Sequence, residues 1–216
     1  MTVGIVFFDV DGTIVTPGSS SSFLAARFGH QDALDDAEAS YADGALTNQQ
    51  VSEIDALAWR GTTTAAIDRW LDDLPVLPGT ETVVEWCRAH GVEPVLASLA
   101  WQPVTRSLAR RFGFVPNGGP RVGERSGVHD GTVAEHFDEF DKRDRALALA
   151  RDLRVPIEHC CAIGDSRSDI PLFQALPSSL ALNASPAARA AASDSVDADD
   201  LALVIPWLEH WIQELI

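Results

Sequence analysis

Short apolar runs alternate with amphipathic segments along most of the chain. The runs are rich in β-branched residues and have the length of buried strands, whereas the segments between them repeat apolar residues at helical spacing. The runs expected to form strands are 3–8, 92–97, 160–164 and 179–183. The segments expected to form helices are 80–91, 101–113, 142–153, 169–176 and 200–214. This alternation predicts an α/β fold, a Rossmann-like and mostly parallel sheet with helices on both faces.

The stretch from residue 16 to residue 77 interrupts this alternation. It contains no strand-like run and consists of a serine-rich loop, "TPGSSSS", and helical segments that end at "LPVLPG". We therefore expect a small helical cap domain inserted after the first strand. The expected boundaries are a core formed by 1–15 and 78–216 and a helical cap formed by 16–77.

Composition limits the possible partners. The 32 acidic residues outnumber the 16 basic ones, so the formal charge is −16 and no stretch forms a basic patch. Such a chain repels nucleic acid and anionic membranes. No apolar stretch approaches the roughly 20 residues of a membrane-spanning helix, and no signal-peptide pattern is present. The expected location is the cytoplasm, and the 3 cysteines, which lack CxxC spacing, are expected to be reduced thiols.

Two aspartates, Asp9 and Asp11, directly follow the first apolar run in "VGIVFFDVDGTIV". One interpretation is structural, with Asp11-Gly12 forming a hairpin turn. A calcium loop is a second interpretation, but Thr13 and Ile14 stand where that loop needs an acid or amide and then a glycine. The third is functional, because carboxylates at the rim of an apolar run are costly unless a partner offsets their charge. This segment alone leaves the first and third interpretations open.

A second pair of acids repeats this arrangement. In "CCAIGDSRSDIPLF", Asp165 and Asp169 follow the apolar run 160–164. Because the carboxyl ends of parallel strands lie at one edge of a sheet, we expect the acids of both segments to meet there. Helix capping by Asp165 or Ser168 would account for one acid only. Three or four converging carboxylates repel one another unless a hard cation neutralises them, and oxygen ligands indicate magnesium rather than zinc.

Lys142 and Ser98 are two further candidates. Lys142 is the only lysine among the 16 basic residues, and at the start of a helix its ammonium can act on a phosphate or carboxylate oxygen. The alternative is an ordinary surface lysine. Ser98 ends the run "VEPVLAS" and can donate its hydroxyl to an anion at a helix start, although a plain helix cap remains the alternative.

Taken in order, "FFDVDGTIV", "VLAS", Lys142 and "GDSRSD" resemble the four motifs of the haloacid dehalogenase superfamily of phosphohydrolases. The resemblance covers nearly the whole chain, and the pair DxDGT and GDSxxD is highly specific, whereas neither half is specific alone. The insert 16–77 resembles the small helical cap of the phosphoserine phosphatase-like branch. The tail "LALNASPAARAAASDSV" is similar to the end of that branch.

The resemblance implies a phosphatase that hydrolyses a small-molecule phosphate monoester through an aspartyl phosphate on Asp9. Asp11 is implied to protonate the leaving alkoxide and then to activate water, with Ser98 and Lys142 completing the catalytic set. The implied ligands of Mg²⁺ are Asp9, the backbone carbonyl of Asp11, Asp165 and Asp169, the last directly or through water. The implied phosphate or substrate contacts are Thr13, Ser98, Leu99, Lys142 and Trp101.

Two other functions remain open. A phosphomutase on the same fold would keep its aspartyl phosphate for return transfer. A phospho-accepting receiver domain of a signalling protein also gathers acids, a lysine and a hydroxyl residue at the end of a parallel sheet. Receiver domains are compact, however, and lack an insert such as 16–77.

The substrate is the least determined part of the prediction. The phosphoserine enzymes follow the motif serine with two glycines, where this chain has Leu99 and Ala100. They also carry a glutamate for the substrate ammonium and an arginine for its carboxylate, whereas "TPGSSSS" has no acid and "TNQQVSEIDAL" has no cation. We therefore predict a neutral or hydroxyl-rich phosphorylated metabolite rather than phosphoserine, and a phosphoserine phosphatase is the alternative. Candidate contacts are 19–22, Trp59, Arg60 and Trp101, and the chain is expected to be a monomer or homodimer.

Overall fold

A six-stranded sheet forms the centre of the computed structural model, which describes residues 2–215. All its strands are parallel, in the order β3-β2-β1-β6-β7-β8. Their bounds are β1 Gly4–Phe8, β2 Val92–Leu96, β3 Val115–Pro116, β6 Cys160–Gly164, β7 Ser178–Leu182 and β8 Asp194–Val196. The predicted α/β fold with a parallel sheet is confirmed, and β1 and β6 are neighbours at its centre.

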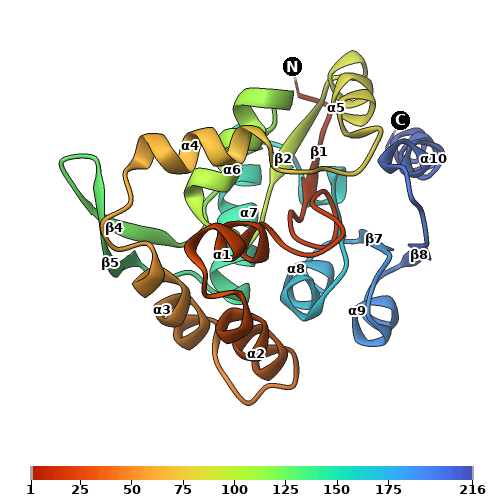
Figure 1. Cartoon of the computed structure of the whole chain (residues 1–216). Coiled ribbons are helices and arrows are strands. Elements are labelled where there is room, and N and C mark those ends of the chain that lie inside the picture. The colour runs from red at the N-terminus through yellow and green to blue at the C-terminus, as the bar shows by residue number, and fades with distance from the viewer. Residues whose placement is uncertain (1, 216) are drawn as a thin grey trace.

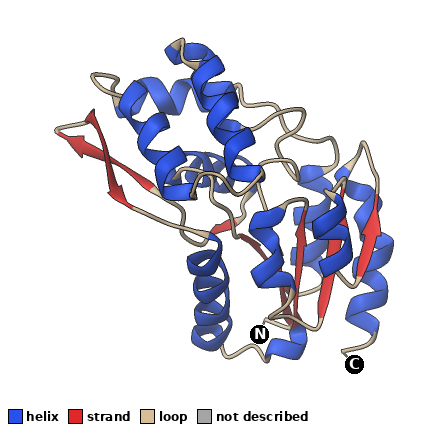
Figure 2. Ribbon diagram, turned by 90° about the horizontal axis from the view of Figure 1, so that it is seen from below, coloured by secondary structure: helices blue, strands red, loops and turns tan. Residues whose placement is uncertain are grey.

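Helices cover both faces of the sheet (Figure 1, Figure 2). Those on one face are α5 (Thr80–Ala89), α6 (Gln102–Phe112) and α10 (Ile205–Gln213). Those on the other face are α7 (Glu139–Leu153), α8 (Ile170–Phe173) and α9 (Pro186–Ala191). Along β1, Val6 and Phe8 pack towards the first set of helices, whereas Ile5 and Phe7 pack towards the second. Because both faces are covered, β1 is buried at every position and reads as a continuous apolar run.

Some element boundaries differ from the prediction. The strands β3 and β8 have only two and three residues, and β8 has the polar sequence DSV, so neither produces a recognisable apolar run. Helix α7 begins before residue 142 because the Asp138 carboxylate accepts hydrogen bonds from the amides of Phe140 and Asp141. The predicted helices 169–176 and 200–214 each consist of a 3-10 turn followed by a shorter α-helix.

The insert after β1 is helical, as the sequence predicts, and it contains four helices. Their bounds are α1 Ser20–Phe28, α2 Gln31–Ala42, α3 Asn48–Ala58 and α4 Thr64–Asp72. One apolar cluster continues from the α5 and α6 face of the sheet into these helices through Leu24, Ala56 and Ile67. The insert is therefore packed onto the core, and the boundaries at 16 and 77 stay a prediction.

A β-hairpin from the second half of the chain packs on the inserted helices. It consists of β4 (Arg121–Arg125) and β5 (Val128–Glu135), and it lies beside α3 (Figure 1). The amide of Gly61 donates to the carbonyl of His129 over 2.9 Å, and the amide of Thr64 donates to the carbonyl of Gly127 over 3.0 Å. The segment that leads into α7 is thus tied to the insert.

The remaining sequence expectations concern thiols and membranes. Cys87, Cys160 and Cys161 are buried free thiols, as predicted. Within residues 2–215, none of the helices combines the length and apolar character that crossing a bilayer requires.

Trp59 joins the insert, the hairpin and the core. Its fully buried ring lies 5.4 Å from the ring of Phe28, 5.6 Å from Trp101 and 5.1 Å from His129, measured between ring centroids. We expect Trp59→Ala to lower the free energy of unfolding by about 3–5 kcal/mol, because it leaves a large cavity. The half-buried Trp86 stacks mainly on His90, so Trp86→Ala is the matched control and should cost less. Urea unfolding measures both variants, and equal losses would contradict this role of Trp59.

Candidate active site

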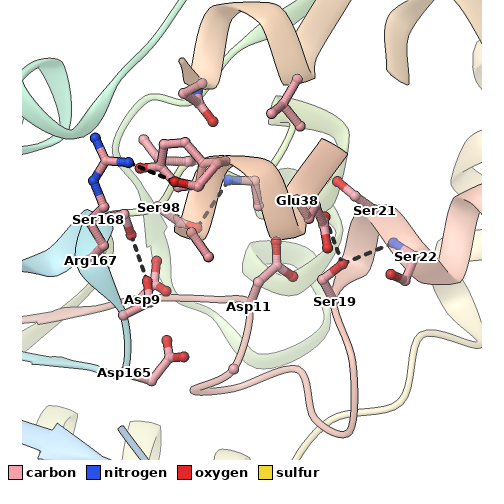
Figure 3. Close-up of a pocket in the computed structure, with 18 of the residues that line it drawn as sticks. Asp9, Asp11, Ser19, Ser21, Ser22, Glu38, Ser98, Asp165, Arg167 and Ser168 are labelled. Carbon is pink, nitrogen blue, oxygen red and sulfur yellow. Dashed lines mark hydrogen bonds between the residues drawn. The ribbon is translucent and has the colours of Figure 1, made fainter. Parts of the chain in front are cut away.

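The carboxyl ends of β1 and β6 bring three carboxylates together. Asp9 directly follows β1 and Asp165 directly follows β6, and the two strands are hydrogen-bonded neighbours. The amide of Asp9 also donates to the carbonyl of Ile163 over 2.9 Å. Carboxylate oxygens of Asp9, Asp165 and Asp169 all lie within 4.8 Å of one another. Figure 3 shows Asp9 and Asp165 facing the same space, with Asp11 beside them.

Lys142 supplies the positive charge of this cluster. Its side chain is fully buried, and its Nζ donates to Asp9 Oδ1 over 2.9 Å and to Asp169 Oδ1 over 2.6 Å. Burial alone lowers the pKa of Lys142, but the ion pairs with Asp169 and Asp9 outweigh burial and raise that pKa above its ordinary value. The lysine is therefore a permanent cation in contact with two of the three carboxylates. Its position agrees with the sequence prediction.

Both carboxylate oxygens of Asp169 accept hydrogen bonds from other groups of the protein. Oδ1 accepts from Lys142, while Oδ2 accepts from the backbone amides of Asp165 and Ser166 over 3.0 and 3.1 Å. A Cβ atom on Gly164 would lie 2.2 Å from the Asp169 Cγ atom, so only glycine leaves room for this carboxylate. Asp169 thus fixes both the loop that carries Asp165 and the ammonium of Lys142.

Asp165 is the carboxylate that no lysine or arginine neutralises. Within the described residues, its carboxylate receives one hydrogen bond, from Thr13 Oγ1 over 3.4 Å, and it has no ion pair. Burial, followed by the charges of Asp9 and Asp169, raises the pKa of Asp165. A Cβ atom at position 12 would lie 2.2 Å from Oδ2 of Asp165, which explains why the first motif has a glycine there.

The cluster fits a hard divalent cation. Asp9 and Asp165 offer carboxylate oxygens from two strands, and the surplus negative charge at Asp165 is the charge that such an ion would neutralise. Asp169 already receives three hydrogen bonds, so it is better placed to orient the other groups than to offer a free oxygen. The donors are all oxygen atoms, which is the set that Mg²⁺ prefers.

Asp11 lies between this cluster and the first inserted helix. Its Oδ1 accepts from the amide of Ser20 over 2.6 Å, and its Oδ2 accepts from the Ser20 hydroxyl over 3.0 Å. Burial, with a contribution from the charge of Asp9, raises the pKa of Asp11 to about 6, although both bonds from Ser20 oppose the rise. A carboxyl group with this pKa can donate a proton in one step and accept one in the next. The sequence analysis names Ser20 only within the candidate contacts 19–22 and does not predict its hydrogen bonds to Asp11.

Ser98 lies on the other side of Asp9, after β2. Its side chain is buried, and its Oγ accepts a hydrogen bond from the amide of Ala100 over 3.1 Å. Because this bond uses the Ser98 oxygen as an acceptor, the Ser98 hydroxyl can still donate its proton to an anion. The turn therefore holds Ser98 at the same sheet edge as Asp9, because β1 and β2 are paired neighbours.

A pocket of about 740 Å³ opens above these groups, between the sheet edge and the inserted helices. The predicted contacts that line it are Asp9, Asp11, Ser19, Ser21, Ser22, Ser98, Leu99, Trp101 and Asp165. Thr13 is fully buried beneath Asp165, whereas Trp59 belongs to the apolar cluster and Arg60 donates to the Asp130 carbonyl. Neither Trp59 nor Arg60 lines the pocket, because their side chains join α3 to the hairpin.

Several lining residues were missed by the sequence analysis, among them Glu38, Tyr41 and Arg167. Glu38 and Tyr41 come from α2, and Arg167 comes from the loop after β6. Leu34, Glu38 and Tyr41 are spaced four and three residues apart and all line the pocket, so one face of α2 forms part of the wall. This helical spacing is the signal that could have identified Glu38.

The model of the haloacid dehalogenase-like hydrolases matches residues 6–174, which include all of the motifs. The chain belongs to this family. The chain is 27% identical over 198 residues to phosphoserine phosphatase SerB2 of Mycobacterium tuberculosis, and the match covers 90% of this chain and 48% of that protein. It is 23% identical over 210 residues to phosphoserine phosphatase of Lactococcus lactis, covering 95% of both chains. The chain thus spans about half the length of the first relative and nearly all of the second.

Solved structures show the same fold. A phosphoserine phosphatase with an analogue of the phospho-aspartyl intermediate superposes with a TM-score of 0.85 at 17% identity, covering 96% of this chain and 99% of that one. A substrate-bound phosphoserine phosphatase gives a TM-score of 0.84 at 16% identity, covering 94% and 97%. The predicted membership of the phosphoserine phosphatase-like branch of this hydrolase family is confirmed.

The crowding of carboxylates predicts an unusual stability effect for Asp165. We expect Asp165→Asn to raise the melting temperature in EDTA at pH 7.5 by about 2–4 °C, corresponding to ~1 kcal/mol, because it removes a carboxyl group whose raised pKa means that folding opposes its ionisation at this pH. We expect the same variant to lose the stabilisation that MgCl₂ gives the wild-type protein. Asp152→Asn, on the exposed face of α7, is the matched control and should behave as wild type. An Asp165→Asn protein that is less stable in EDTA and still gains from Mg²⁺ would contradict this interpretation.

Proposed function

We propose that this protein is a Mg²⁺-dependent phosphomonoesterase in which Asp9 is transiently phosphorylated. The observation that carries the proposal is the meeting of Asp9, Asp165 and Asp169 around a buried Lys142, with Asp11 beside them at the floor of a pocket. This arrangement provides a nucleophile, a cation site and a proton donor at one sheet edge.

In the first step, an Asp9 carboxylate oxygen attacks the phosphorus atom of the ester. An O–P bond forms to Asp9 as the P–O bond to the alcohol breaks, and Asp11 donates its proton to the leaving alkoxide. Lys142 and the Ser98 hydroxyl are suited to bind phosphoryl oxygens, because both lie beside Asp9. Lys142 also holds the Asp9 oxygen in position through their hydrogen bond.

In the second step, water attacks the phosphorus atom of the aspartyl phosphate. Asp11, now ionised, accepts the proton of that water, and the bond between Asp9 and phosphorus breaks to release inorganic phosphate. Asp9 and Asp165, with the Asp11 carbonyl, would hold Mg²⁺, and Asp169 would act through water or through its partners. When bound, the ion supplies charge that offsets the repulsion between the carboxylate and the phosphoryl group.

The comparisons change the predicted substrate. The matched curated relatives are phosphoserine phosphatases, which supports phosphoserine, the alternative in our prediction, over a neutral or hydroxyl-rich ester. The lack of an acidic residue in 16–22 no longer argues against phosphoserine, because Glu38 of α2 lines the pocket. Phosphoserine is therefore the first substrate to test. A receiver-like signalling function is disfavoured because the pocket is large enough for an organic substrate.

The direct test is phosphate release from p-nitrophenyl phosphate. We expect steady, multiple-turnover release with MgCl₂, no release with EDTA, and a loss of at least about 1000-fold in Asp9→Asn, because the nucleophile is removed. The matched control is again Asp152→Asn, which should keep wild-type rates. Stoichiometric labelling without turnover would indicate a phospho-accepting protein instead, and unchanged turnover in Asp9→Asn would overturn the assignment of the nucleophile.

The role of Asp11 predicts a dependence on the leaving group. In Asp11→Asn, we expect kcat/KM for an alkyl phosphate to fall by about 100- to 10,000-fold, because the alkoxide needs a proton. For p-nitrophenyl phosphate, whose leaving group needs no proton, the fall in kcat/KM should be much smaller. Single-turnover rates with both esters measure the difference, and equal losses would mean that Asp11 is not the proton donor.

A further inference from the structure

Asp55 is a buried carboxylate of the insert, and aromatic side chains surround it. It lies in α3 with 2% of its side chain exposed. Its Oδ2 accepts a hydrogen bond from the indole nitrogen of Trp101 over 2.6 Å, and its Oδ1 accepts one from the indole nitrogen of Trp59 over 3.3 Å. Nε2 of His30 lies 2.9 Å from the same Oδ1. His30 and Trp59 belong to the insert, whereas Trp101 belongs to the core, so Asp55 joins the two.

Trp101 ends the loop that begins with Ser98. It directly precedes α6, and its side chain is buried, with the ring 5.6 Å from the ring of Trp59 between centroids. The amide of Ala100 donates to Ser98 Oγ over 3.1 Å, so the loop is a tight turn. Only two residues separate Ser98 from Trp101, and a shift of the indole would therefore also move the Ser98 hydroxyl.

The core holds the backbone of the same loop. The amide of Gln102 donates to the carbonyl of Pro120 over 3.0 Å, and the side chain of Gln102 donates to the carbonyl of Gly119 over 3.0 Å. A Cβ atom at position 119 would lie 2.5 Å from the carbonyl oxygen of Ala100. The core thus fixes the backbone of loop 98–101, and the hydrogen bond to Asp55 fixes the indole at its end.

We propose that Asp55 is a positioning residue, which holds loop 98–101 through the Trp101 indole so that the Ser98 hydroxyl meets the phosphoryl group. This inference rests on the proposed phosphomonoesterase function, in which Ser98 binds a phosphoryl oxygen. Asp55 lines the pocket, but both of its oxygens already accept hydrogen bonds from the protein. It therefore acts through Trp101 rather than on the substrate. A residue of the insert thereby becomes part of the phosphate site of the core.

The first test breaks the hydrogen bond from either end. Leucine has the branched shape of aspartate without an acceptor, and phenylalanine keeps an aromatic ring without the indole N–H. We expect Asp55→Leu and Trp101→Phe each to lower kcat for p-nitrophenyl phosphate by about 10- to 100-fold, because a small misplacement of a group that binds the reacting atoms is costly. KM should change by less than about threefold.

Two further variants serve as controls, and melting temperatures show that each protein is folded in the assay. Asp55→Asn keeps one acceptor oxygen for Trp101 and can turn its NH₂ group towards Nε2 of His30, so it should recover most of the lost kcat. Asp68→Asn, exposed on α4, is the matched control and should keep the wild-type rate.

A double-mutant cycle with Ser98 tests whether the effect reaches the phosphate site. In Ser98→Ala the hydroxyl donor is gone, so its position no longer matters. We expect Asp55→Leu to lower kcat by less than about threefold in that background, compared with at least about 10-fold in the wild-type background. A role of Asp55 in packing alone would give the same loss in both backgrounds.

The outcomes separate this inference from the proposed function. Wild-type kcat in Asp55→Leu or in Trp101→Phe would overturn the inference alone, as would equal losses with and without the Ser98 hydroxyl. An Asp55→Asn protein as slow as Asp55→Leu would also overturn it. Should Asp55→Leu fail to fold, Trp101→Phe and its own cycle with Ser98→Ala decide. A wild-type protein that releases no phosphate with MgCl₂ would overturn the proposed function together with the inference.

Discussion

The site depends on carboxylates that repel one another being held together at one edge of a sheet. Parallel pairing of β1 and β6 places Asp9 and Asp165 side by side, and two glycines, Gly12 and Gly164, leave the space that the acids occupy. Lys142 neutralises only part of their charge, because it contacts Asp9 and Asp169 but not Asp165. The energetic cost of the remaining charge would favour the binding of a divalent cation to the cluster. The backbone thus brings the acids together, and their uncompensated negative charge would attract a divalent cation.

The inserted helices supply the groups that the sheet edge lacks. Ser20 at the start of α1 orients Asp11, and the buried surroundings keep the pKa of that carboxyl near 6, where it can exchange protons. Helix α2 adds Glu38 to the pocket wall, and the hydrogen bond between Trp101 and Asp55 ties the loop after Ser98 to α3. In the proposed mechanism the phosphoryl chemistry therefore resides on the core, whereas proton transfer also depends on the insert.

Most of the fold and of the reactive centre could be predicted from the sequence because the relevant signals are local. An apolar run followed by acids marks both the strand and the sheet edge, as at Asp9 and Asp165, and a single lysine in a chain of arginines marks Lys142. The part of the pocket wall that α2 forms could not be predicted in this way. Glu38 lies far along the chain from the serine-rich loop beside which it packs, so a search for charges in 16–22 failed to find it. Short polar strands such as β8 were not predicted for a related reason: pairing with a neighbouring strand stabilises them, and their own sequence has no apolar pattern.

The shared cation is the central claim, and its position can be measured directly. Crystals grown with Mn²⁺ in place of Mg²⁺ should give an anomalous difference peak between Asp9 and Asp165, within about 2.0–2.4 Å of an oxygen of each. The same peak should be absent from crystals of Asp165→Asn. A peak elsewhere in the wild-type protein, or none at the sheet edge, would contradict the account.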